Sequence, residues 1–254
     1  MKWADLFSFM TERDPAFEAT TLGADRNDIE TVEQEIGITL PYSYVDFITT
    51  IGADTGRYHP FGPEMDTNFY RLLRQVPTED YDVREYFPIA LETNESRAPM
   101  CDLYLDLRRS DGADAPLVLA ENGSDWCRMS DEEITLLERL TESAWPAFEL
   151  PCYSANRVIY VHAEGAEALG TAREQVLDLL DRRGHVPTLP SQHRVDCTAS
   201  ETEASIVRVK EHLGLIRLVV AGHDEKELGR VVELFIDNVP NAAVNVKMPS
   251  LPVH

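Results

Sequence analysis

The chain has 254 residues, of which 43% are hydrophobic and 27% charged, a composition that is typical of a soluble globular protein and excludes a disordered one. Its net charge of -22 is unevenly distributed: residues 1–150 carry 31 acidic side chains against 12 basic ones, whereas residues 151–254 carry 14 against 11. The resulting net charge of -19 on the first part repels phosphate backbones and anionic lipid head groups, so we expect neither a nucleic-acid partner nor a membrane partner.

No stretch approaches the roughly 20 apolar residues of a membrane span, and the first residues lack the pattern of a secretory signal. The four cysteines are scattered and form no CxxC pair, which favours reduced, mostly buried thiols. We therefore expect a cytoplasmic protein. The cysteines are Cys101, Cys127, Cys152 and Cys197.

The first elements in chain order are helical. Trp3, Leu6, Phe7 and Met10 have the spacing of a short amphipathic helix. Residues 26–52 then predict two helices separated by a tight break. We expect Gly37 to end the first of them in a left-handed conformation, and Ile38 to fold back on its last turn. Pro41 is predicted as the first residue of the second helix.

Strands follow a loop rich in Gly, Pro and Asp. Residues 69–76 predict a helix, residues 86–91 a strand, and residues 101–107 a half-buried strand that pairs with residues 116–120. Ser130 and Glu133 match a capping box, which predicts a helix through Leu140. Strands with helices at both ends indicate an α+β fold with an antiparallel sheet flanked by helices.

A segment with two prolines, residues 146–156, coincides with the change in charge density. We place a boundary there, which gives domains of residues 1–150 and 151–254. The second domain reads as strand and helix in alternation, including a helix after a second capping-box pattern at Ser200 and Glu203. It predicts a small layered α/β domain of ferredoxin-like or related arrangement.

The helix pair and the elements after it resemble one known family, the SUKH superfamily. The likeness rests on Leu40-Pro41-x-x-Tyr44-x-x-Phe47, on the preceding helix, and on the later order of strands and closing helix, and it covers about residues 25–148. The superfamily includes fungal cell-wall assembly regulators and bacterial immunity proteins. The resemblance implies a protein that binds and neutralises a cognate toxin, often a nuclease, inside the producing cell.

Two other functions stay open at this stage. One is a non-catalytic regulatory or scaffold module that uses the same fold on a cellular partner. The other is an enzyme with its site in residues 151–254, where His162 and His223 each follow a predicted strand and could lie close together. We expect no catalytic activity, because no nucleophile motif of the G-x-S-x-G kind is present.

Aromatic side chains among carboxylates are suited to protein recognition, with the aromatic groups as central anchors. Two such clusters are candidate partner-binding sites, although the aromatic residues of the first could equally pack its loop on the core. The first cluster comprises Asp54, Tyr58, Phe61, Glu64 and Asp66, with Phe69 beside it. The second comprises Tyr81, Asp82, Asp125 and Trp126.

Three other patterns have more ordinary explanations. Asp102 and Asp106 share the polar face of a strand, where we expect both to be solvated and ionised. Residues 165–171 resemble a phosphate loop, but they lack the lysine that such a loop requires. His185, His193 and Cys197 fit no compact zinc spacing, and the histidines are expected to lie in exposed loops. The sequence thus predicts no cofactor and no metal.

Overall fold

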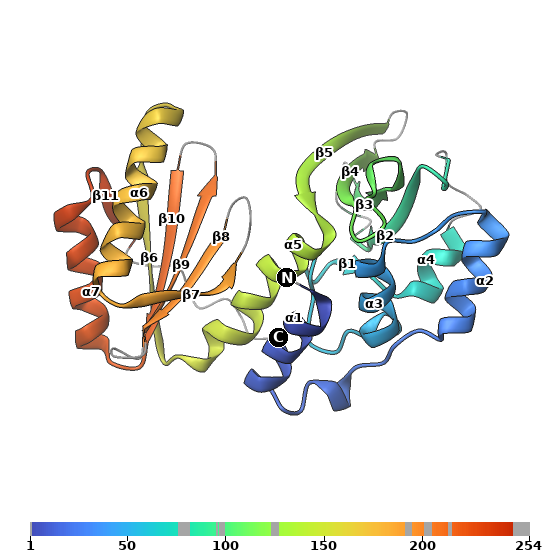
Figure 1. Ribbon diagram of the computed structural model, residues 1–254, viewed down its shortest axis with the longest axis horizontal. Coiled ribbons are helices and arrows are strands. Elements are labelled where there is room, and N and C mark those ends of the chain that lie inside the picture. Colours follow the sequence, from blue (N-terminus) through green and yellow to red (C-terminus); the bar gives the residue numbers. More distant parts are fainter. Residues whose placement is uncertain are drawn as a thin grey trace. The chain divides into compact units, whose positions relative to one another are not determined.

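The computed structural model has an α+β fold and divides into two compact units, Met1–Ala144 and Trp145–His254 (Figure 1). It describes residues 2–75, 82–94, 96, 100–122, 127–190, 195–200, 205–212 and 215–245. The division falls just before the proline-containing segment at which the sequence places a boundary.

The first unit consists of helices and one antiparallel sheet. Its strands lie in the order of the sequence, from β1 to β5, and each pairs with the next. The pairing of residues 101–107 with residues 116–120 is therefore confirmed. The helices are α1 (Trp3–Arg13), α2 (Arg26–Ile36), α3 (Tyr42–Ile51), α4 (Phe69–Gln75) and α5 (Leu136–Ala144), and the strands are β1 (Met65–Asp66), β2 (Tyr86–Glu92), β3 (Met100–Asp106), β4 (Pro116–Asn122) and β5 (Cys127–Thr135).

The break between α2 and α3 is stabilised by hydrogen bonds to Glu33. Gly37 has φ of 77°, and the amides of Gly37 and Ile38 both donate to the Glu33 carbonyl, which confirms the left-handed helix end. The Glu33 carboxylate accepts a further bond of 2.7 Å from the amide of Leu40. Pro41 precedes α3 as its N-cap residue, one position earlier than predicted.

Aromatic side chains join α1, α3 and β2 in one core. Trp3 meets Phe47 edge to face with 5.3 Å between ring centroids, and Tyr44 meets Phe87 at 5.8 Å. The indole nitrogen of Trp3 donates to the hydroxyl of Thr50 at 2.9 Å. The core thus fixes which side of α3 faces inward.

The predicted helix start at Ser130 is wrong. Strand β5 continues to Thr135, because Met129, Ser130 and Asp131 pair with β4. The capping box lies five residues later: the amide of Thr135 donates to the Glu138 carboxylate, and the amide of Glu138 donates to the Thr135 hydroxyl. Sheet pairing here prevails over a local capping pattern.

The second unit is a six-stranded antiparallel sheet in the order β11-β6-β10-β9-β8-β7. Its buried core contains residues from both helices together with the alternating Ile216, Leu218 and Val220, so both helices cover the same sheet face. The order is related to the split β-α-β sheet of ferredoxin-like folds, with β7 and β8 added at one edge. The elements are β6 (Ala155–His162), α6 (Ala166–Arg182), β7 (His185–Pro190), β8 (Val195–Ser200), β9 (Ser205–His212), β10 (Leu215–Gly222), α7 (Glu225–Asn238) and β11 (Ala242–Asn245).

The helix predicted after Ser200 is also wrong. Ser200 ends β8 and pairs with Ser205, and Ile206, Val207 and Val209 continue the pairing in β9. These β-branched side chains favour a strand, and the strand-helix alternation predicted for this unit is interrupted here by the run of strands from β7 to β10.

In the part of the chain that the structure describes, no helix is both long and apolar enough to cross a membrane. Cys101 is half-buried and Cys152 is exposed, so the expectation of mostly buried thiols does not hold for Cys152.

Candidate functional site

The two aromatic residues of the first predicted cluster are buried. Tyr58 has no exposed surface, and its hydroxyl donates to the Leu140 carbonyl at 2.6 Å and lies 2.8 Å from the Ser143 hydroxyl. Burial raises the pKa of Tyr58 above its ordinary value, although the hydrogen bond with Ser143 opposes the shift. Phe61 is 9% exposed. Both side chains therefore pack the loop on the core, and neither is available as an anchor.

The carboxylates of the same loop have different roles. Asp54 is exposed, and its side chain accepts a hydrogen bond from the amide of Gly56 at 2.9 Å. The Glu64 carboxylate accepts from the Asn94 side chain at 3.2 Å. Asp66 accepts from Arg71 at 2.9 Å. The three carboxylates thus bind three different partners, Gly56, Asn94 and Arg71.

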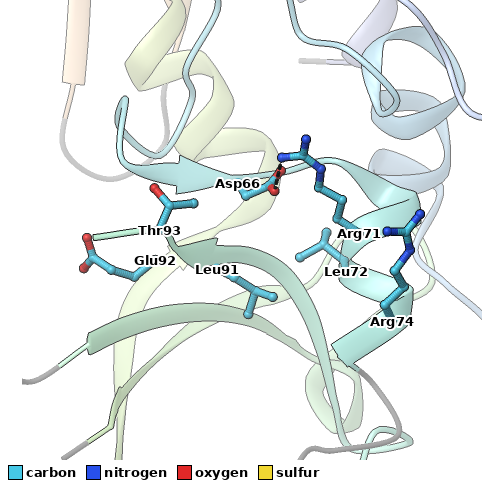
Figure 2. A pocket seen from close by; sticks show the side chains of 7 residues that line it. All are labelled: Asp66, Arg71, Leu72, Arg74, Leu91, Glu92 and Thr93. Carbon is cyan, nitrogen blue, oxygen red and sulfur yellow. Dashed lines mark hydrogen bonds and ion pairs between the residues drawn. The ribbon is translucent and has the colours of Figure 1, made fainter. Parts of the chain in front are cut away.

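A hollow of about 300 Å³ lies where α4, β1 and β2 meet (Figure 2). Asp66 of β1 and Arg71 of α4 form an ion pair on one side of the hollow, and Arg74 follows on α4 (Figure 2). The Glu92 carboxylate is on the other side, from β2. The side chains that line the hollow are Asp66, Arg71, Leu72, Arg74, Leu91, Glu92 and Thr93.

The chemistry of this hollow is mixed. A ligand pocket is usually larger, mostly apolar and equipped with a few convergent polar groups. Among the described lining residues, only Leu72 and Leu91 are apolar. The charge of Arg71 is neutralised by Asp66, whose hydrogen bond raises the pKa of that arginine. No serine, cysteine or histidine is among the described residues that line the hollow, so these residues offer no nucleophile and no general base of those types.

Of the second predicted cluster, Tyr81, Asp125 and Trp126 lie outside the described residues. Asp82 is exposed and accepts hydrogen bonds from the Arg84 side chain at 2.9 Å. These bonds lower the pKa of the Asp82 carboxyl. The carboxylate is therefore ionised and locally paired.

The two aspartates of β3 are not solvated as predicted, since Asp102 is 8% exposed and Asp106 1%. Asp102 accepts a hydrogen bond from the amide of Glu92 at 2.8 Å. Burial alone raises the pKa of Asp106, but side-chain hydrogen bonds from Arg108 and Arg109 outweigh it and hold that pKa below its ordinary value. The alternation of the strand correctly predicts that Asp102 and Asp106 share one face, but both side chains are buried there.

The histidine pair of the second unit is separated. His162 pairs with Leu215 at the start of β10, whereas His223 follows Gly222, which pairs with Ala155 at the far end of β6. Eight residue pairs separate the two positions, roughly 25 Å at the rise of an antiparallel strand. The expectation of neighbouring strand ends is wrong because β6 and β10 are antiparallel.

The remaining motifs are structural. Gly170 and Thr171 lie inside α6, where the Thr171 hydroxyl donates to the Glu167 carbonyl, so residues 165–171 form no phosphate loop. His185 begins β7 and is 4% exposed, contrary to the predicted exposed loop. Cys197 pairs with Leu189 in the same sheet, and His193 lies outside the described residues. Within the described ranges no three His, Cys, Asp or Glu side chains are grouped as metal ligands.

One aromatic side chain among the described residues of the first unit is exposed, and the sequence interpretation did not select it. Tyr42, the first residue of α3, is 73% exposed, and Leu22 is 63% exposed. Helical periodicity could have found Tyr42, because the apolar stripe of Tyr44, Phe47, Ile48 and Ile51 excludes it. We call Leu22, Tyr42, Asp46, Asp54 and Asp111, all of them exposed, the α3 face.

Comparisons with known proteins found no match. No family model matches the chain, and neither a characterised protein nor a solved structure matches it.

Proposed function

We propose that this chain is an immunity-type protein, whose first unit binds and neutralises a cognate protein toxin in the cytoplasm of the producing cell. Binding is stoichiometric: carboxylates of the first unit meet basic side chains of the toxin, and no substrate is converted. A nuclease is the favoured class of toxin, because an active site that grips phosphates is cationic.

The observation that carries the proposal is the position of the acidic charge. On α2, Asp28, Glu30 and Glu35 are exposed, and Arg26 is the only basic residue of that helix. Helix α3 contains no Lys or Arg, and its Asp46 is exposed. The net charge of -19 on residues 1–150 is thus displayed in part by two consecutive helices. Such a surface steers a cationic partner and excludes acidic ones.

The resemblance to the SUKH superfamily supplies the step from protein binding to immunity. The motif residues Leu40, Tyr44 and Phe47 are at most 2% exposed, so they pack the helix pair and leave the surface free to differ between partners. A fold that keeps its core motif and varies its surface suits proteins that must each recognise a different toxin.

Co-expression with the toxin gene encoded beside this chain tests the proposal. Growth should be rescued, and the two purified proteins should form a complex of equal stoichiometry. A scaffold protein would bind a cellular partner and leave the cells unprotected. Absence of both rescue and binding for every neighbouring toxin would contradict the proposal.

Charge variants test whether the first unit binds the toxin. Glu30→Gln, Glu35→Gln and Asp46→Asn together remove three exposed carboxylates from α2 and α3 and should weaken the complex. Glu164→Gln, Glu167→Gln and Glu174→Gln remove three exposed carboxylates from the second unit and are the matched control. Equal weakening by both sets would indicate a non-specific charge effect.

A further inference from the structure

We propose that the α3 face is the docking site for a basic segment of the partner, with Tyr42 and Leu22 as its two anchors. This inference rests on the proposed function, and it names the surface of the first unit that makes the contact. The occupant is a polypeptide segment that presents an arginine or lysine beside aliphatic side chains.

The two anchors lie at opposite ends of α3. Tyr42 begins the helix, and its amide donates to the Gly112 carbonyl at 3.0 Å. Near the other end, the amide of Ala24 donates to the Ile48 carbonyl at 2.8 Å, which seats residues 22–24 on the helix. The two positions of α3 that bind the anchor segments, Tyr42 and Ile48, are six residues apart, about 9 Å along the helix axis.

Hydrogen bonds hold the chain in place at both anchors. Leu22 and Asp54 exchange two such bonds, each of 2.9 Å. At the other end, the amide of Ser43 donates to the Ala113 carbonyl, and the hydroxyl of Ser43 donates to Asp114 at 2.6 Å. A surface whose backbone is already ordered loses little conformational entropy on binding.

The charges around the anchors are negative. Asp46 follows Tyr42 by four residues and so lies on the same side of α3. Asp111 is adjacent in sequence to Gly112, the residue whose carbonyl binds the Tyr42 amide. Its carboxylate accepts hydrogen bonds of 2.8 Å from the amides of Ala113 and Asp114, which lower its pKa and keep it ionised. In the described part of the chain Asp46 has no ion-pair partner.

The chain contains an internal example of the recognition that we infer. The guanidinium carbon of Arg108 lies 4.4 Å from the centre of the Tyr86 ring, and the same guanidinium donates to Asp106 at 2.9 Å. An arginine of the partner can bind in the same way. Its guanidinium can stack on the Tyr42 ring and donate hydrogen bonds to the carboxylate of Asp46 or of Asp111. Leu22 then packs against aliphatic side chains of the segment.

Affinity for the purified, catalytically inactivated toxin from the neighbouring gene tests this inference. Tyr42→Ala and Leu22→Ser should each weaken binding about tenfold or more, mainly through faster dissociation. Tyr42→Phe should bind almost as the wild type, because the ring is retained. Ile236→Ser removes a 41% exposed apolar side chain from the second unit and is the matched control. Circular dichroism checks that each variant is folded.

The outcomes separate this inference from the proposed function. If the wild type does not bind the toxin, the proposed function fails. If the wild type binds and Tyr42→Ala and Leu22→Ser bind equally well, the toxin is held elsewhere and only the inference is overturned. If Tyr42→Ala instead abolishes self-association of the pure chain, the face joins two copies and the inference is overturned.

Discussion

At the scale of single residues, two buried tyrosines of the first unit differ in how their hydroxyls are satisfied. Tyr58 donates to the Leu140 carbonyl, whereas the Tyr44 hydroxyl has no hydrogen-bond partner among the described residues. Tyr58→Phe should therefore lower the free energy of unfolding by about 1–2 kcal/mol. Tyr44→Phe should leave it unchanged or raise it slightly, because an unsatisfied polar group is removed. Urea unfolding of both variants measures the difference.

The Asp106 carboxylate should contribute a pH-dependent part of the stability. Its folded pKa lies below the ordinary value of 3.8, so the contribution is present above that value and is lost as the pH falls through the folded pKa. At neutral pH, Asp106→Asn should lower the free energy of unfolding by about 1–3 kcal/mol, since two half-exposed arginines lose a charged partner.

Urea unfolding between pH 2.5 and pH 7 compares this variant with the wild type. Steps of about 0.5 pH units suffice, because a single group titrates over about 2 pH units. The variant should lose less stability than the wild type below the ordinary pKa. Asp46→Asn, at an exposed position, is the control and should change stability by less than about 0.5 kcal/mol. Parallel curves for wild type and Asp106→Asn would show that the arginines do not stabilise the ionised carboxylate.

At the scale of elements, the left-handed end of α2 depends on Gly37. The space around its Cα is open, so Gly37→Ala meets no neighbour and only the positive φ is strained. We expect a loss of about 1 kcal/mol in the free energy of unfolding. Gly37→Asn should lose less, because asparagine tolerates this conformation better. Equal stability of Gly37→Ala and wild type would mean that the helix end can rearrange.

The sequence predicts those elements whose signal is local. Gly37 and Pro41 mark the helix pair within one or two residues, and strict alternation identifies β3. The failures come from non-local pairing. Ser130 and Ser200 each precede a glutamate by three residues, but partners in neighbouring strands decide their structure, and a capping pattern contains no information about those partners.

For the candidate site too, local patterns are predicted from the sequence and tertiary contacts are not. The sequence predicts an acidic, protein-binding first unit and selects Asp54, but it also selects the buried Tyr58 and Phe61. Tyr58 binds Leu140 of helix α5, 82 residues further on, which no local pattern could predict. Tyr42 could be recognised as exposed from the periodicity of α3. Leu22 could not, because its position beside Asp54 is set by tertiary hydrogen bonds.

At the scale of the whole molecule, the uneven charge leads us to predict how the association rate depends on salt. The rate of association with a cationic partner should fall steeply as salt rises from 0.1 M to 1 M, because the Debye length shrinks from about 10 Å to about 3 Å. The rate of dissociation should change less, since it reflects short-range contacts. Stopped-flow mixing with the inactive toxin measures both rates. A salt-independent association rate would leave the acidic excess as a solubility feature only.

The Asp114 side chain has a consequence for the order in which the chain becomes functional. It accepts hydrogen bonds from the Ser43 hydroxyl at the start of α3 and from the amides of Ala115 and Leu137, so it links the start of α3 to the start of α5. Roughly 85 residues lie between these helices, which corresponds to roughly 4–17 s of translation. In a nascent chain this link from α3 to α5 should therefore form only after Leu137 has left the ribosome, whatever the progress of the second unit.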